Sequence, residues 1–129
     1  MPSRARDWFA QAERDLEHAV LSVEINHYDW ACFASQQSSE KALKAVYQSL
    51  GGEARGHDLD GLLQGLEERV SVPAELMECA AELGKHYIAT RYPNAHAEGP
   101  PSRHYTQREA RRAVEHAREI LRFCADHLA

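Results

Sequence analysis

The residues with the clearest potential for chemistry lie between Lys85 and Thr106, the longest stretch of this 129-residue sequence without a regular hydrophobic pattern. Within it, Arg91 and His96 are separated by four residues, a spacing that a loop can fold so that both side chains meet. An arginine can bind two phosphate oxygens and stabilise charge in a transition state. A histidine that titrates near neutral pH can take a proton from a ribose 2′-hydroxyl or give one to the leaving oxygen. The pair would suit metal-independent phosphodiester chemistry, although an Arg and a His at this spacing are common by chance.

Other side chains could complete a site for a phosphate or a nucleotide. Tyr87, Tyr92 or Tyr105 could stack on a base, and the first two lie close to Arg91 in the sequence. Lys41 and Lys44 are candidate secondary cations. Arg91 also has a purely structural interpretation, because the helix dipole favours a cation at a helix C-terminus. The residues alone leave both interpretations open.

The two lysines belong to a polar stripe on a predicted helix, together with Gln37 and Glu40. Gln37 and Lys41 form one pair at the i,i+4 spacing, and Glu40 and Lys44 form another with the acid first, which is the favoured orientation. The structural interpretation is a ladder that faces solvent. The functional one is a polar wall of a cleft.

Charge is unevenly distributed along the chain, whose formal net charge is −5. Eight acids and two bases lie between Glu53 and Glu82, whereas six arginines and three glutamates lie between Arg103 and Arg122. The net charge argues against a general nucleic-acid coat. The basic helix could steer a phosphate or an acidic partner, or could simply be a solvated face.

Composition restricts the other classes of function. Three widely spaced cysteines (Cys32, Cys79 and Cys124) lie in apolar helical stripes and are predicted to be buried and reduced. No pair of residues has metal-ligand spacing, so we expect neither a metal nor a cofactor. No apolar run approaches the roughly 18 residues of a membrane span. The N-terminal residues lack an apolar signal-peptide core, and we expect a cytoplasmic protein.

Hydrophobic residues recur at three- and four-residue steps over most of the chain, and nowhere at a period of two. We therefore predict a single all-α domain over residues 1–129, an antiparallel up-down bundle of four long helices and one short one. The predicted helices are Asp7–Val23, Trp30–Leu50, a short helix capped by Asp58, Pro73 to Arg91 or Tyr92, and one that starts at Thr106.

Particular residues define the ends and the packing of these helices. Asp29 is a predicted N-cap, and Gly51-Gly52 closes the second helix. That helix is rich in Ala, Ser and Cys, so we expect it to pack centrally. His57 and Asp58 could form a site, but a cap and its neighbour also explain them. Gly99-Pro100-Pro101 is predicted to exclude regular structure before the capping box that begins at Thr106.

Three segments of the chain together resemble the HEPN domain, a family of nucleotide-binding helical bundles. These segments are F-A-S-Q-Q-S-S-E-K-A-L-K-A at 33–45, G-H-D-L at 56–59 and Y-I-A-T-R-Y-P at 87–93. The resemblance implies a small helical homodimer with a polar cleft between subunits, which often pairs with a minimal nucleotidyltransferase. Many members are ribonucleases of toxin–antitoxin or defence systems with an R-x4-6-H motif, which Arg91 and His96 match. The T-R-Y-P form, with Tyr92 after Arg91, resembles the branch known mainly as nucleotide-binding or accessory subunits.

The sequence thus predicts a protein that binds a nucleotide or RNA and acts as the partner of a minimal nucleotidyltransferase in a toxin–antitoxin-like or defence system. Arg91 would contact phosphate, assisted by Lys41, Lys44, Tyr87 and Tyr92. A first alternative is a metal-independent endoribonuclease, with Arg91 as phosphate clamp and His96 as general base. A second is a non-catalytic structural interaction module.

Overall fold

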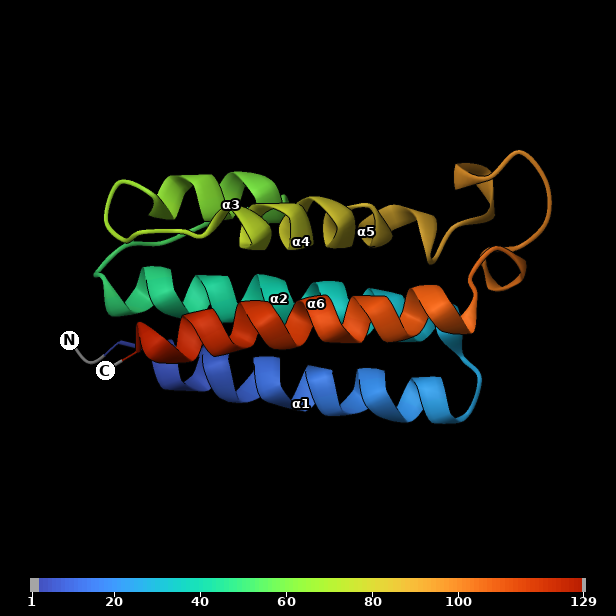
Figure 1. Cartoon of the computed structure of the whole chain (residues 1–129), viewed down its shortest axis with the longest axis horizontal. Helices are drawn as coiled ribbons and strands as arrows, with labels where there is room; N and C mark the ends of the chain where they lie inside the picture. Colours follow the sequence, from blue (N-terminus) through green and yellow to red (C-terminus); the bar gives the residue numbers. More distant parts are fainter. Residues whose placement is uncertain (1–2, 129) are drawn as a thin grey trace.

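The computed structural model describes residues 3–128, which form the predicted all-α bundle (Figure 1). Residues 1, 2 and 129 of the predicted domain lie outside the described residues. The elements, in chain order, are α1 (Ala5–Glu24), α2 (Tyr28–Ser49), α3 (Leu59–Leu66), α4 (Ala74–Gly84), α5 (His86–Ala89), the 3-10 turns η1 (Pro93–Ala95) and η2 (Pro101–Arg103), and α6 (Gln107–Asp126). Between residues 3 and 128 there is no strand.

Helix α2 is the central element, as its small residues predicted. It packs against both α1 and α6, and the three helices lie side by side in Figure 1. Ala31 and Ala42 are completely buried, and the Ser38 hydroxyl donates to the Ala12 carbonyl of α1 at 2.6 Å. Such a contact between a side chain and the backbone of a neighbouring helix requires close approach, which small side chains permit.

Helices α3 and α4 lie next to each other and form a second layer over α2 (Figure 1). The leucines of α3 are buried in this layer, namely Leu59, Leu62, Leu63 and Leu66. The Tyr47 hydroxyl of α2 donates to the Leu62 carbonyl at 2.7 Å. The hydrogen bond ties α3 to α2.

The fourth long helix is interrupted, which the sequence analysis did not predict. It is divided into α4 and α5 at Lys85, directly after Gly84, and it ends at Ala89 rather than at Arg91 or Tyr92. Glycine lowers helix propensity by about 1 kcal/mol relative to alanine, so this point is weak. Tyr92 has extended angles (φ −121°, ψ 125°), which confirms the predicted effect of the proline that follows it.

The connection between α5 and α6 is more ordered than predicted. Pro101, in the segment expected to exclude regular structure, instead opens η2, because the fixed φ of proline suits the first position of such a turn. Gly99 has a φ of +76°, and a Cβ at this position would lie 3.1 Å from the Arg103 guanidinium. Thr106 and Glu109 form the predicted capping box at the start of α6.

Two predicted helix caps are wrong in detail. Helix α2 begins at Tyr28, so its N-cap is His27 and Asp29 lies in the first turn. Asp58 occupies the N-cap position of α3, but its side chain makes no capping hydrogen bond.

None of the helices described is long and apolar enough to cross a membrane.

Candidate functional site

Arg91 follows Thr90, the C-cap of α5, and its guanidinium folds back onto the end of the helix. Nε and Nη2 both donate to the Tyr87 carbonyl, at 2.9 and 2.6 Å. This carbonyl is one of the last in the helix and would otherwise lack an intrahelical partner. The structural interpretation of Arg91 as a tie at the helix end is therefore confirmed.

Aromatic rings surround the same guanidinium. Its Cζ lies 4.3 Å from the ring centre of Phe33, 4.7 Å from that of Tyr87 and 5.0 Å from that of Tyr92. Each such contact with an arginine stabilises by about 0.5–1 kcal/mol at exposed sites. Within residues 3–128, no carboxylate lies at ion-pair distance from Arg91. The rings stabilise the positive charge without neutralising it.

One edge of the guanidinium remains available for a ligand. An arginine carries five N–H donors, and the Tyr87 carbonyl occupies Nε and one donor of Nη2. The edge formed by Nη1 and the second Nη2 donor has no hydrogen-bond partner among the described residues. Such an edge matches two oxygens of a phosphate.

A buried carboxylate of α2 holds His57 beside this cluster. Glu40 Oε1 accepts from His57 Nδ1 at 2.9 Å, and the Glu40 side chain is only 5% exposed. Gln36 Nε2 donates to Glu40 Oε1 at 3.2 Å and to the His57 carbonyl at 3.3 Å. The His57 ring stacks on Tyr87, with centroids 4.2 Å apart. These contacts exceed what the neighbour of a helix cap requires, and they support the alternative interpretation that His57 belongs to a site. The signal for His57 in the sequence was its position in G-H-D-L, one of the three segments that resemble the HEPN domain.

The polar stripe of α2 does not form the predicted solvent-facing ladder. Lys44 Nζ does donate to Glu40 Oε2 at 3.1 Å, which confirms that pair, but the pair is buried rather than exposed. Gln37 donates to the Gln36 side chain instead of pairing with Lys41. Lys41 Nζ instead donates to Asp15 of α1 at 2.6 Å. Both candidate lysines thus already face a carboxylate.

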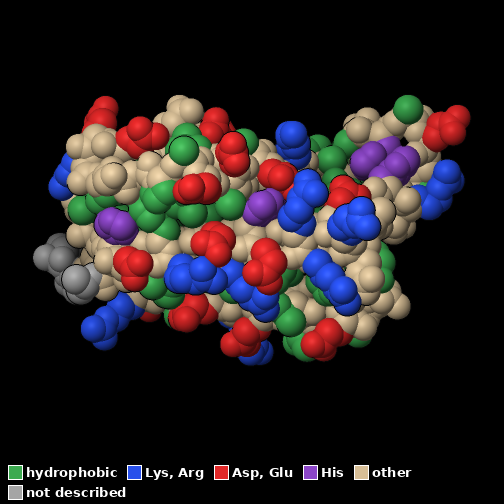
Figure 2. All heavy atoms as spheres, in the orientation of Figure 1, with side chains coloured by type: hydrophobic (Ala, Val, Ile, Leu, Met, Phe, Trp, Pro, Cys, Tyr) green, Lys and Arg blue, Asp and Glu red, His purple; other side chains and the backbone are tan. Residues whose placement is uncertain are grey.

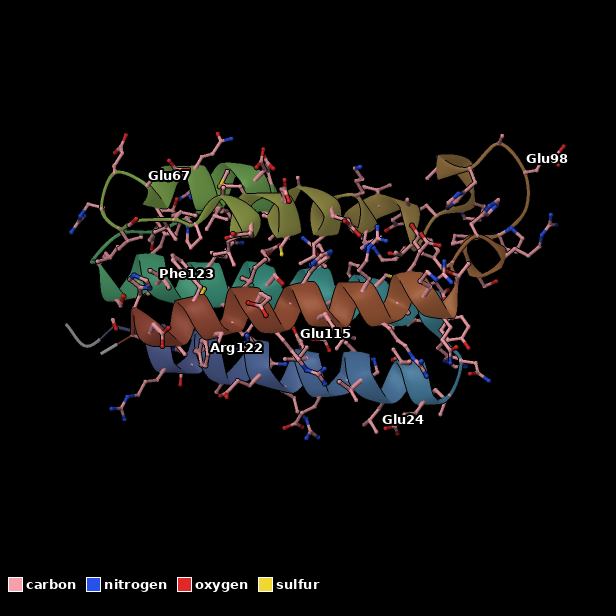
Figure 3. The ribbon with its side chains drawn as sticks, in the orientation of Figure 1. Glu24, Glu67, Glu98, Glu115, Arg122 and Phe123 are labelled. Carbon is pink, nitrogen blue, oxygen red and sulfur yellow. The ribbon has the colours of Figure 1, made fainter. Side chains whose placement is uncertain are left out.

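His96 lies in different surroundings from Arg91. Its Nε2 lies 2.6 Å from the Ala89 carbonyl, its ring stacks on His104 with centroids 4.3 Å apart, and Tyr105 meets its edge. His104 Nε2 bonds in turn to the Glu98 carbonyl. Figure 2 shows histidine side chains gathered on this loop, and Figure 3 shows Glu98 at its tip, at the end of the molecule away from the termini. Within one chain, the structure does not bring Arg91 and His96 together.

His96 lines an open pocket of about 510 Å³ between α4, α5, α6 and the loop, with His86, His104 and Tyr105 among its other walls. Burial lowers the pKa of His86, so this imidazole is neutral at neutral pH. Burial also raises the pKa of Tyr105 to about 12, so the phenol stays protonated. A hydrogen bond from Arg112 lowers the pKa of Glu82 in the same pocket.

The cysteines are buried, as predicted. Burial raises the pKa of Cys32 to about 12 and raises that of Cys79 and Cys124 as well. A thiol is nucleophilic as the thiolate. At neutral pH these cysteines are therefore core residues and not candidate nucleophiles.

Comparison with known proteins gives one consistent result. The profile of the HEPN domain matches residues 5–127. A curated protein of Methanocaldococcus jannaschii, named "Putative toxin MJ1304", is 28% identical over 133 residues, which cover 96% of this chain and 88% of that protein.

Solved structures match over nearly the whole chain. TT1696 from Thermus thermophilus is 48% identical with a TM-score of 0.96, over 98% of this chain and 100% of that one. ST0689, described as an archaeal HEPN homologue, is 39% identical with a TM-score of 0.84, over 100% of both chains. An HEPN domain protein from Thermotoga maritima is 41% identical with a TM-score of 0.77, over 93% of this chain and 95% of that one.

Proposed function

The chain belongs to the HEPN domain family, and on this premise we propose that it binds a nucleotide or RNA through a phosphate held by Arg91. The observation that carries the proposal is the unpaired guanidinium edge among three aromatic rings. Tyr92, which is exposed beside this edge, would offer its ring to a base. Lys41 and Lys44 are secondary contributors, because each already pairs with a carboxylate.

Binding to a short, labelled single-stranded RNA tests this proposal. The purified protein is titrated at several salt concentrations, followed by fluorescence anisotropy. We expect an affinity that falls as salt rises, because phosphate contacts release counterions. An affinity independent of salt, or no binding by the wild-type protein, contradicts the proposal and favours a structural interaction module.

Two parts of the proposal concern assembly. The protein would act as a homodimer, which is supported by exposed apolar side chains close to the site, Trp30, Ile88 and Tyr92. It would also act with a minimal nucleotidyltransferase in a toxin–antitoxin-like or defence system, which is supported by the T-R-Y-P segment and by the name of the archaeal relative. Sedimentation of the purified chain, alone and co-expressed with a nucleotidyltransferase encoded beside it, tests both parts.

The second candidate function is metal-independent endoribonuclease activity with Arg91 as phosphate clamp and His96 as general base. The observation that favours it is the orientation of His96. Because a carbonyl can only accept, Nε2 donates to Ala89, and Nδ1 is the ring nitrogen left for a substrate. The test is RNA cleavage in EDTA by wild type, Arg91→Ala and His96→Ala. Cleavage by wild type that both variants lose supports the activity, and intact RNA rules it out for the isolated protein.

A further inference from the structure

A second hollow, lined in part by Tyr87, lies between α3 and the α4–α5 helix pair. It is an open groove of about 580 Å³, with walls that include His57, Asp58, Asp60, Lys85, Tyr87 and Ile88. Figure 1 shows α3 beside the chain of α4 and α5 that bounds it. Its floor contains small residues at positions 80, 81 and 84. Tyr87 is shared between this groove and the proposed phosphate site, whereas Arg91 itself does not line the groove.

The groove is rich in hydrogen-bond acceptors. Asp58 and Asp60 contribute carboxylates, and the side chain of Asp58 has no hydrogen-bond partner among the described residues. His57 contributes Nε2. Nδ1 donates to Glu40, which leaves Nε2 as the ring nitrogen without a hydrogen-bond partner among the described residues. Lys85 is the main cation along the walls. Such a surface repels a phosphate and suits a group that donates hydrogen bonds.

His57 is unusually constrained for a residue at the surface. Its side chain is 49% exposed, yet three contacts hold it: Glu40 on Nδ1, Gln36 on the carbonyl, and Tyr87 against the ring. A buried carboxylate that fixes an exposed imidazole leaves Nε2 with one orientation. Preorganisation of this kind, with a supporting residue behind the exposed one, is typical of a ligand-binding group.

One aromatic ring separates this acceptor from the phosphate site. His57 stacks on Tyr87, and the Arg91 guanidinium lies against the same ring. A ligand that bridges them must combine an anionic group with a nearby hydrogen-bond donor. A ribonucleotide does so, because its ribose hydroxyls lie next to its phosphate. We propose that the groove binds the ribose of the ligand, with His57 Nε2 accepting a hydrogen bond from the 2′-hydroxyl, so that the protein prefers RNA to DNA.

This inference rests on the proposed phosphate contact of Arg91, so the experiment separates the two. Wild type, Arg91→Ala, His57→Phe and the control His18→Phe are titrated with a short single-stranded RNA and with DNA of the same sequence. Phenylalanine preserves the stacking on Tyr87 and removes both nitrogens. His18 is an exposed residue of α1 that does not line the groove.

We expect wild type and His18→Phe to bind RNA about five- to tenfold more tightly than DNA, as one hydrogen bond would provide. His57→Phe should bind RNA only as tightly as DNA. RNA with 2′-O-methyl groups provides a test without mutation, because wild type should then lose its preference even if His57→Phe fails to fold.

Equal affinity of wild type for RNA and DNA overturns the inference, as does a preference that survives in folded His57→Phe or with 2′-O-methyl RNA. Arg91→Ala reports on the proposed function separately, because it should weaken RNA and DNA binding alike. If Arg91→Ala weakens binding of both RNA and DNA while wild type shows no preference for RNA, the phosphate contact is supported and the ribose contact is contradicted. If wild type binds neither, the proposed function fails, and the ribose site with it.

Discussion

Arg91 and His96 are close in sequence but belong to two regions that are built differently. Arg91 lies against α2 and the Tyr87 ring, where its neighbours are aromatic rings and a helix carbonyl. His96 lies between the end of α5 and its own loop, where its neighbours are a carbonyl, His104 and Tyr105. The first region keeps an unpaired positive charge on a rigid scaffold. The second is a loop held by short-range contacts among its own residues and with the end of α5. We infer that charge recognition belongs to the first region, and that the second mainly shapes the loop.

The largest effect should come from the carboxylate behind the first region. Glu40→Gln leaves the nearly buried Lys44 ammonium without its counter-charge. Breaking a buried ion pair on one side typically costs about 3 kcal/mol or more. Urea denaturation of the variant should show this loss in the free energy of unfolding. Glu17→Gln, which removes an exposed pair with Arg14, should cost about 0.5 kcal/mol or less. Equal losses in the two variants would show that Glu40 has no special role.

Removal of the cation should have the next largest effect, on binding rather than on folding. Arg91→Ala loses a bidentate, charge-assisted phosphate contact, so RNA affinity should fall roughly thirtyfold, or about 2 kcal/mol. The plot of log affinity against log salt concentration should become less steep, by the amount expected for the loss of about one phosphate contact. Arg103→Ala, in the second region, is the matched control and should change affinity by less than about threefold. A similar loss in both variants would remove the distinction between the regions.

A smaller effect is expected from the histidine stack. His96→Ala loses the bond to the Ala89 carbonyl and the contact with His104, a change of about 1 kcal/mol confined to the loop. Trypsin should then cleave faster after Arg103, while RNA affinity should stay within about twofold of wild type. A large loss of affinity would instead place His96 in the binding site.

The smallest effect concerns pH. Because burial lowers the pKa of folded His86 below its ordinary value of 6.5, the unfolded chain binds more protons just below that pH. The free energy of unfolding should therefore fall as the pH drops through 6.5, and it should fall less steeply in His86→Phe. The pKa of Glu82 is lowered from its ordinary value of 4.5. Glu82 therefore changes the free energy of unfolding only below about that pH, outside the range in which His86 acts. Denaturation curves of wild type and His86→Phe from about pH 7.5 to about pH 5.5 measure the free energy of unfolding. The same pH dependence in both proteins would contradict the prediction.

Local signals predicted the helices, because hydrophobic period, capping residues and glycine stops act over a few residues. The Thr106 capping box and the extended Tyr92 are confirmed for this reason. The site was harder to predict, because its contacts join distant positions. The polar stripe on α2 fitted either a solvent-facing ladder or the wall of a cleft. The burial of Glu40 could not be predicted, because its partner His57 lies 17 residues away in the sequence. The separation of Arg91 from His96 likewise depends on where η1 and η2 direct the loop, which spacing alone does not specify.

Position 87 performs two tasks with two different parts of one residue. The carbonyl that holds Arg91 belongs to the backbone and is present whatever the side chain, whereas the ring that supports His57 depends on an aromatic residue. Evolution can therefore alter the two functions one at a time. Replacement of the tyrosine by an aliphatic residue would release the histidine, whereas the arginine would lose one ring contact and keep its bonds to the carbonyl. Among relatives, we expect the identity of residue 87 to vary together with that of residue 57, while the arginine is retained independently of both.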